Sequence, residues 1–152
     1  MLEAQGVRVT VASTRPGVAT GMRGARVAVA CTVRQADPAR YDAVALAGGS
    51  GAPAHLWDSA PLASLVRAAH RAGKPVAAIC LAPPVLARAG VLAGRRATTF
   101  PTDRAIAELR RGGAVYVRDP VVRDGTVVTA SGPEAAAAFG AALARLLKPG
   151  AP

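Results

Sequence analysis

Short apolar runs alternate with stretches of helical spacing along most of this 152-residue chain. Residues 43–47 and 76–79 are wholly apolar, which is typical of strands buried on both faces of a parallel sheet. Residues 60–72 carry apolar side chains at helical spacing, with Ser59 placed to cap the helix and Gly73 placed to end it. Residues 84–89 and 102–111 predict two further helices.

The two ends of the chain predict smaller elements. Residues 2–5 have the pattern of a last helical turn closed by Gly6, and residues 7–12 alternate like a strand. Residues 13–20 predict a loop, residues 26–30 a second strand, and residues 98–100 fit neither a helix nor a strand. The C-terminal part predicts strands at 114–117, 121–122 and 126–130, a turn at Asp124 and Gly125, and a helix from Gly132 to about residue 147.

Strands that alternate with helices predict an α/β fold, in which helices cover both faces of a mainly parallel sheet. We expect one domain over residues 1–147, followed by a disordered tail at residues 148–152. Sites in such folds form at the carboxyl ends of the strands. Gly48 and Gly49 follow one apolar strand and Cys80 follows the other, so we expect them side by side at this edge.

Cys80 lies where the apolar strand gives way to a helix with prolines in its first turn. The nucleophile of other α/β enzymes occupies such a corner. The positive, N-terminal end of the helix that begins there favours the negatively charged thiolate form of a cysteine. Neighbouring glycines let backbone N–H groups approach a ligand, which suits an oxyanion site. The alternative is a structural thiol, because free cysteines are often buried.

Charge and composition narrow the classes of partner. The formal net charge is +10, but the arginines are scattered and no aromatic residue lies among them, so nucleic acid is not expected as the main partner. No apolar run has membrane-spanning length and no signal peptide is visible, so we expect a cytoplasmic protein without a membrane partner. Cys31 and Cys80 suit a reducing compartment, and the histidines and cysteines lack metal-ligand spacing, so we expect no metal or cofactor.

Four segments that span nearly the whole chain in order resemble the ThiJ/PfpI superfamily, which includes the parkinsonism-associated deglycase. They are YDAVALAGG at 41–49, GKPVAAIC at 73–80, APPVLARAGVLAGRRATTFP at 82–101 and DGTVVTASGPEAAAAFG at 124–140. The resemblance implies a flavodoxin-like three-layer sandwich, a homodimer, and Cys80 as the reactive nucleophile. It also implies that the N–H groups of Gly49 and Leu81 face the substrate oxygen. We expect six residues to line the pocket: Gly48, Ser50, Phe100, Pro101, Gly132 and Pro133.

The sequence departs from the family pattern at three places. It begins at the end of the first helix, so the first strand and a glutamate that contacts the cysteine have no counterpart, and we expect unpaired strand edges. A start codon assigned too late, a truncated protein or a partner chain would each explain this, and the helical pattern at 2–5 favours the first. Leu81 and Phe100 stand where many members have histidines, and neither His55 nor His70 matches a catalytic position.

Three functions therefore remain open from the sequence. The first is a glyoxalase or deglycase-type enzyme, whose Cys80 thiolate attacks a small reactive carbonyl such as methylglyoxal or a glycated substrate. The second is a redox-sensing stress protein or chaperone that oxidises Cys80. The third is a catalytically silent relative that serves in binding or dimerisation. Cys31 is interpreted as a core or interface thiol.

Overall fold

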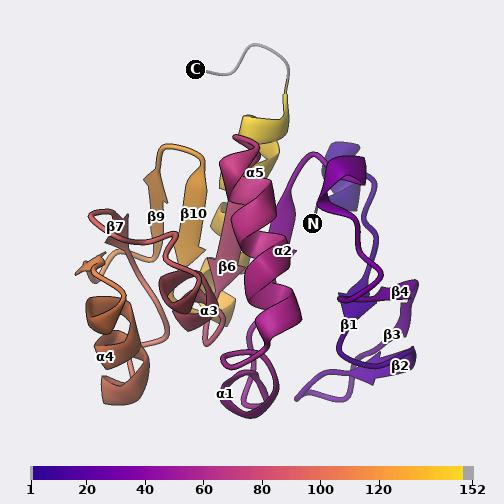
Figure 1. Cartoon of the computed structure of the whole chain (residues 1–152), viewed down its shortest axis with the longest axis horizontal. Helices are drawn as coiled ribbons and strands as arrows, with labels where there is room; N and C mark the ends of the chain where they lie inside the picture. Colours follow the sequence, from indigo (N-terminus) through magenta and orange to yellow (C-terminus); the bar gives the residue numbers. More distant parts are fainter. Residues whose placement is uncertain (1, 149–152) are drawn as a thin grey trace.

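The computed structural model describes residues 2–148, and its central feature is a four-stranded sheet (Figure 1). The strands are, in spatial order, β5 (Val44–Leu46), β6 (Val76–Ile79), β10 (Val127–Ala130) and β9 (Val121–Asp124). The first three are parallel, and β9 joins β10 through an antiparallel hairpin. Val44 and Val127 both lie opposite Val76, so the carboxyl ends of β5, β6 and β10 come level at one edge.

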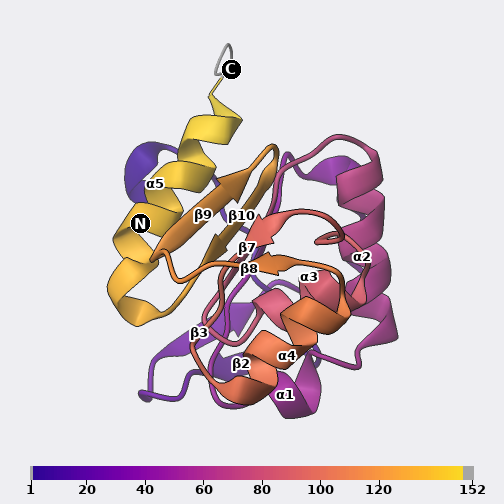
Figure 2. The same cartoon turned by 90° about the vertical axis from the view of Figure 1, so that its left-hand side faces the viewer.

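Helices cover both faces of this sheet (Figure 2). The helices α2 (Ala60–Arg71), α3 (Pro83–Arg88) and α4 (Asp103–Arg111) lie on one side, and α5 (Ala136–Leu147) lies on the other. Leu62, Val66 and Leu86 belong to the core of the first side, whereas Val128 and Phe139 belong to the second. The structure therefore confirms the α/β class with a mainly parallel sheet and three layers.

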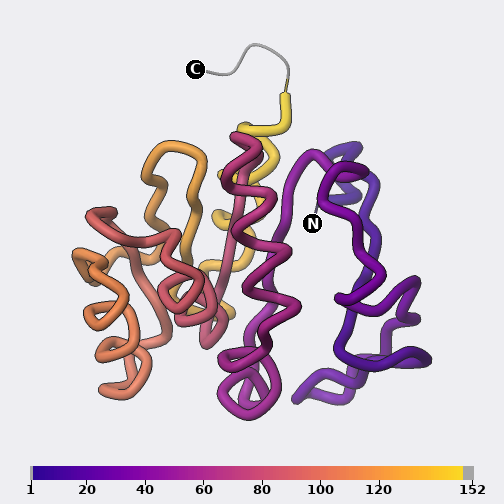
Figure 3. Tube along the Cα trace, viewed as in Figure 1, coloured from indigo at the N-terminus to yellow at the C-terminus, as the bar shows by residue number. Residues whose placement is uncertain are grey.

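The first forty residues run along one flank of the molecule (Figure 3). They form a 3-10 turn η1 (Glu3–Gln5), a parallel pair of β1 (Ala12–Ser13) and β4 (Cys31–Thr32), and an antiparallel hairpin of β2 (Gly17–Thr20) and β3 (Arg26–Val29). Within residues 2–148, β1 pairs only with β4 and β5 pairs only with β6. In the described part of the chain β5 is therefore one edge strand of the central sheet and β9 is the other, and the expectation of edges left unpaired by an absent first strand stays a prediction. Val9 is 44% exposed.

Two expectations for this flank are wrong. Of the predicted strand 7–12 only Ala12 belongs to a strand, β1, which continues to Ser13 and pairs with β4. Residues 7–11 take part in no strand pairing among the described residues, although the Val11 carbonyl accepts from the Ala30 N–H at 2.9 Å. The predicted loop 13–20 contains β2, which is a strand because β3 pairs with it. The turn that Asp37 and Pro38 predict is the 3-10 turn η2 (Pro38–Arg40), whereas the short helix α1 (Ala52–His55) was not predicted.

The remaining elements follow the pattern more closely. Residues 98–100 form no strand, and the short parallel pair nearby is β7 (Arg96–Ala97) with β8 (Val115–Tyr116). The last helix is a 3-10 turn η3 (Pro133–Ala135) that continues into α5. Lys148 follows α5, and residues 149–152 of the predicted tail lie outside the described residues. No helix within residues 2–148 is long and apolar enough to cross a membrane.

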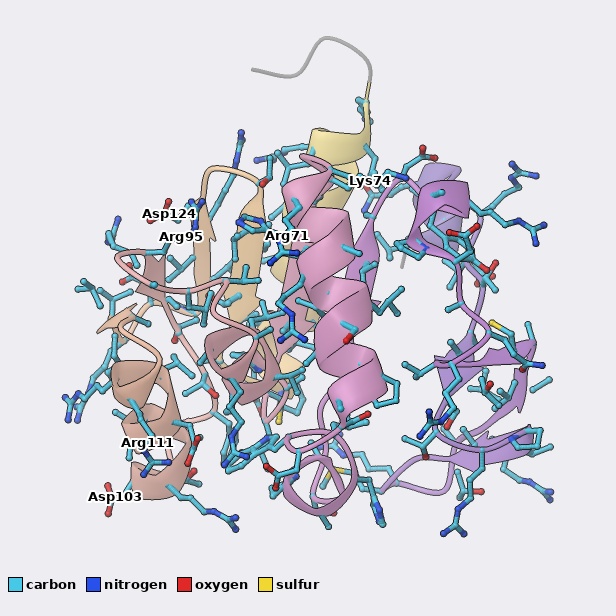
Figure 4. The ribbon with its side chains drawn as sticks, in the orientation of Figure 1. Arg71, Lys74, Arg95, Asp103, Arg111 and Asp124 are labelled. Carbon is cyan, nitrogen blue, oxygen red and sulfur yellow. The ribbon has the colours of Figure 1, made fainter. Side chains whose placement is uncertain are left out.

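Local contacts show why the main helices begin where they do. The Ser59 hydroxyl accepts from the N–H of Leu62, and the Thr102 hydroxyl accepts from the N–H of Ala105. Lys74, labelled in Figure 4, donates from Nζ to three backbone carbonyls of the segment around η2, at 2.6 to 3.1 Å. This contact fixes the N-terminal flank at the end of the sheet opposite Cys80, because Lys74 precedes β6 and Cys80 follows it.

Candidate functional site

Cys80 occupies a strained turn at the carboxyl end of β6. Its φ is +64°, and it is the one non-glycine residue with a positive φ in the described part of the chain. A side chain in this conformation costs about 1–3 kcal/mol, and the conformation persists only where the surroundings impose it. The residue as a whole is half-buried. Strain of this kind concentrates at functional sites, which directs attention to the contacts that hold the turn.

Hydrogen bonds hold the backbone of this turn on both sides of the sulfur. The N–H of Cys80 donates to the carbonyl of Ala130 at 2.9 Å. The Cys80 carbonyl accepts from the Thr99 hydroxyl at 2.8 Å and from the Phe100 N–H at 2.9 Å. A peptide unit is planar, so fixing the Cys80 carbonyl also fixes the direction of the Leu81 N–H in the same unit. The residues before α4 thus orient a backbone donor beside the sulfur.

The glycine turn after β5 lies against the Cys80 turn, as the sequence predicted. A methyl group built on Gly48 would lie 2.5 Å from the Ile79 carbonyl oxygen and 2.7 Å from the Leu81 nitrogen. Only glycine allows this close approach, because backbone atoms cannot move aside as a flexible side chain can. No hydrogen bond within residues 2–148 uses the N–H of Gly49 or Leu81. Both donors are thus available next to Cys80.

Trp57 supports the turn from the helical side. It is 3% exposed, and its Nε1 donates to the Leu81 carbonyl at 2.7 Å. Two guanidinium groups lie over its ring, with Arg88 Cζ at 5.5 Å and Arg104 Cζ at 4.9 Å from the ring centroid. A buried indole with these two contacts and a hydrogen bond from its Nε1 supports the peptide that follows Cys80.

A compact group of charges lies behind Trp57. Arg88 pairs with Glu108 at 2.8 Å and with Asp58, and Arg111 also pairs with Glu108. The hydrogen bond from Arg88 is the main cause that lowers the pKa of Glu108, against an opposing effect of burial. The same bond raises the pKa of Arg88. Both groups are therefore ionised at neutral pH, and their pairing explains how Glu108 can be a buried carboxylate.

The other residues expected to line the pocket differ in their exposure, and their role in a pocket stays a prediction. Phe100 contacts Cys80 through its backbone, and its ring lies 3.3 Å from the position of a methyl group built on Gly132. Ser50, Pro101 and Pro133 are exposed. Cys80 lines neither of two hollows on the surface, one of about 580 Å³ beside α4 and one of about 450 Å³ beside Trp57.

Sequence reasoning missed three residues of this region: Trp57, Thr99 and Met22. Trp57 is the single tryptophan of the chain, which is a signal that composition offered. Thr99 lies next to a residue already singled out, but its bond to the Cys80 carbonyl spans 19 positions and has no local signature. Among the described residues, no group of three or more His, Cys, Asp or Glu side chains could hold a metal ion.

The neighbouring threonines Thr98 and Thr99 offer a matched test of the turn. We expect Thr99→Val to lower the free energy of unfolding by about 1–3 kcal/mol, because it removes a buried hydrogen bond to the Cys80 carbonyl. Thr98→Val removes a buried hydroxyl that has no partner among the described residues, so its effect should be neutral or stabilising. Urea unfolding of both variants measures the difference. Equal effects would show that the Thr99 bond does not support the turn.

The amino-acid sequence is similar to one protein family and to several individual proteins. The sequence profile described as the DJ-1/PfpI family matches residues 1–146. Deglycase PH1704 of Pyrococcus horikoshii is 35% identical over 147 residues, which cover 97% of this chain and 87% of that protein. The uncharacterised protein MJ0967 of Methanocaldococcus jannaschii is 42% identical over 140 residues, or 92% of this chain and 68% of that protein.

Solved structures show the same arrangement. A ThiJ/PfpI domain protein from Brachyspira murdochii has a TM-score of 0.90 at 30% identity, covering 95% of this chain and 82% of that one. DJ-1beta of Drosophila melanogaster has a TM-score of 0.84 at 32% identity, covering 95% of this chain and 77% of that one. These likenesses confirm the flavodoxin-like fold that the sequence resemblance implied.

Proposed function

Since this chain belongs to the DJ-1/PfpI family, we propose that it is a glyoxalase- or deglycase-type enzyme whose Cys80 thiolate attacks small reactive carbonyls such as methylglyoxal. The observation that carries the proposal is the strained Cys80 turn, with its φ of +64° and the unused N–H groups of Gly49 and Leu81 beside it. Relatives named deglycases, including PfpI of Pyrococcus furiosus at 34% identity, support the reaction class.

The chemistry begins with addition of the thiolate to the aldehyde carbon. A carbon–sulfur bond forms, the π electron pair of the carbonyl moves to oxygen, and the oxygen then takes a proton from water to give a hemithioacetal. The N–H groups of Gly49 and Leu81 would donate to the oxygen as its negative charge develops. The hydrogen on the former aldehyde carbon then moves to the adjacent ketone carbon, which reduces the ketone to an alcohol and oxidises the hemithioacetal to a thioester. One water cleaves the carbon–sulfur bond of the thioester, which releases a 2-hydroxy acid and returns the Cys80 thiol, with no net oxidation or reduction and no cofactor.

Two further features belong to the same proposal. A homodimer is proposed from the family resemblance, and a reducing, cytoplasmic location from the free thiols Cys31 and Cys80. Neither feature enters the chemistry of Cys80, because the donors beside it come from the same chain.

Product analysis of the wild-type protein tests this function. We expect proton NMR to show methylglyoxal disappearing and lactate appearing in equal amounts, at a rate proportional to protein concentration. Loss of methylglyoxal no faster than with an equal mass of albumin would contradict the enzyme. In that case treatment with peroxide distinguishes the two alternatives. Addition of two oxygen atoms to Cys80 alone would favour the redox-sensing protein, and no addition would favour the catalytically silent relative.

A further inference from the structure

The ends of three adjacent parallel strands surround the Cys80 sulfur. Gly49 follows β5, Cys80 follows β6 and Gly132 follows β10, and β6 lies between the other two strands. Neighbouring strands are about 4.8 Å apart, so side chains above the ends of β5 and β10 flank Cys80 at the distance of a small ligand. The side chains at these two strand ends would contact the part of a substrate next to the reacting carbon.

Met22 occupies the β5 side. It lies in the turn between β2 and β3, which is closed by bonds of 2.7 Å from the Gly21 N–H to the Ala25 carbonyl and of 2.9 Å from the Gly24 N–H to the Gly21 carbonyl. The Met22 sulfur lies 3.8 Å from a methyl group built on Gly49, and the residue is 69% exposed. A flexible apolar side chain therefore lies beside the glycine that follows β5.

Phe100 occupies the β10 side. Its N–H is bonded to the Cys80 carbonyl, so its backbone is fixed to the turn. Its ring turns toward Gly132, where atoms Cδ2 and Cε2 lie 3.3 and 3.7 Å from the position of a built methyl group. The residue is 38% exposed, although an aromatic ring normally gains by burial.

These two residues stand out among the exposed apolar side chains. The described residues include six large hydrophobic side chains that are exposed: Val9, Val18, Met22, Val27, Phe100 and Val115. Single exposed hydrophobic residues need no explanation, but Met22 lies beside Gly49 after β5 and Phe100 beside Gly132 after β10, and these two strands flank the strand that ends at Cys80. Two polar side chains also lie at these loops: the Glu134 carboxylate is 3.4 Å from a methyl group built on Gly132, and the His55 ring is 3.4 Å from one built on Gly51.

We propose that Met22 and Phe100 form an apolar rim that selects α-oxoaldehydes with a large apolar substituent, aliphatic or aromatic, over methylglyoxal. The inference rests on the proposed function of Cys80. When the thiolate adds to the aldehyde carbon, the substituent on the adjacent ketone carbon extends toward the rim. Contact with the Met22 side chain and the Phe100 ring removes apolar surface from water, and this gain grows with the size of the substituent.

The ratio of kcat/KM for phenylglyoxal to kcat/KM for methylglyoxal tests the rim. We expect the wild-type ratio to exceed about ten, since one additional methylene in an apolar site already discriminates by about tenfold or more. Met22→Ala and Phe100→Ala should each lower the ratio at least about threefold, and the double variant should bring it near one. Val27→Ala, an exposed position on β3, is the matched control and should leave the ratio unchanged.

Initial rates are corrected by subtracting the rate of Cys80→Ala protein, which accounts for the reaction of both aldehydes with arginine. A wild-type ratio near one would contradict the proposal that the rim selects large substituents. A double variant that keeps the wild-type ratio would also contradict it. Neither result would contradict the proposed role of Cys80. Consumption that persists undiminished in Cys80→Ala overturns both proposals. If Phe100→Ala does not fold, the ratio measured for Met22→Ala is the test of the proposal. This variant is expected to fold because Met22 lies in an exposed turn.

Discussion

Replacing Cys80 with alanine is expected to lower the rate of methylglyoxal consumption by about a thousandfold or more. The expectation follows from the chemistry, because the backbone donors of Gly49 and Leu81 remain in the variant but no carbon–sulfur bond can form. Proton NMR of the substrate measures the effect, and circular dichroism should show an unchanged fold. Alanine replaces only the sulfur and keeps the same backbone at a φ of +64°.

Cys31→Ala is the matched control for this substitution. Cys31 is the other cysteine of the chain, half-buried in β4 on the N-terminal flank. It has no hydrogen bond to the Cys80 turn or to the glycine turn, so we expect its loss to leave the rate within about twofold of wild type. Equal losses in the two variants, or retained activity in Cys80→Ala, would show that Cys80 is not the nucleophile.

A single methyl group at Gly48 is expected to destabilise the protein by about 3 kcal/mol and to abolish activity. In Gly48→Ala the new carbon would lie 2.5 Å from the Ile79 carbonyl oxygen, 2.7 Å from the Leu81 nitrogen and 2.9 Å from the Cys80 Cβ. Two of these atoms are backbone, and Ile79 belongs to a strand paired on both sides. Relief therefore requires β5 to move away from β6. Urea unfolding and methylglyoxal turnover measure the two effects.

Alanine substitutions at two other glycines are the controls for Gly48→Ala. Gly51→Ala meets only a His55 ring carbon at 3.4 Å, so its effect on stability should stay within about 0.5 kcal/mol. Gly112→Ala meets the Ala87 carbonyl at 2.8 Å, far along the chain from Cys80, and should destabilise the fold without lowering turnover per folded molecule. Wild-type stability in Gly48→Ala would contradict the close contact between the two turns.

The sequence predicted the elements whose signals are local. The wholly apolar run 76–79 coincides with β6, because a central strand is apolar on both faces. Ser59 and Thr102 cap α2 and α4 as expected, since a cap depends on residues within one turn. The juxtaposition of Gly48 and Cys80 also followed from the pattern, because parallel strands bring their carboxyl ends together.

The features that sequence could not predict depend on distant partners. Residues 7–12 have strand-forming side chains, yet only Ala12 among them belongs to a strand, because pairing and not propensity decides the outcome. The hydrogen bond from Trp57 to the Leu81 carbonyl joins residues 24 positions apart, and neither segment has a sequence pattern that predicts it. Met22 reaches Gly49 only because the hairpin of β2 and β3 folds toward the end of β5.

Competitive labelling of the two thiols is the most direct measurement of the role assigned to Cys80. Limiting iodoacetamide followed by peptide mass spectrometry gives the labelling rate of each cysteine, with and without excess methylglyoxal. We expect Cys80 to be labelled when methylglyoxal is absent and to be protected when it is present, while labelling of Cys31 is unaffected. A Cys80 that resists labelling, or one that methylglyoxal fails to protect, would contradict the assignment of its sulfur as the atom that meets the carbonyl.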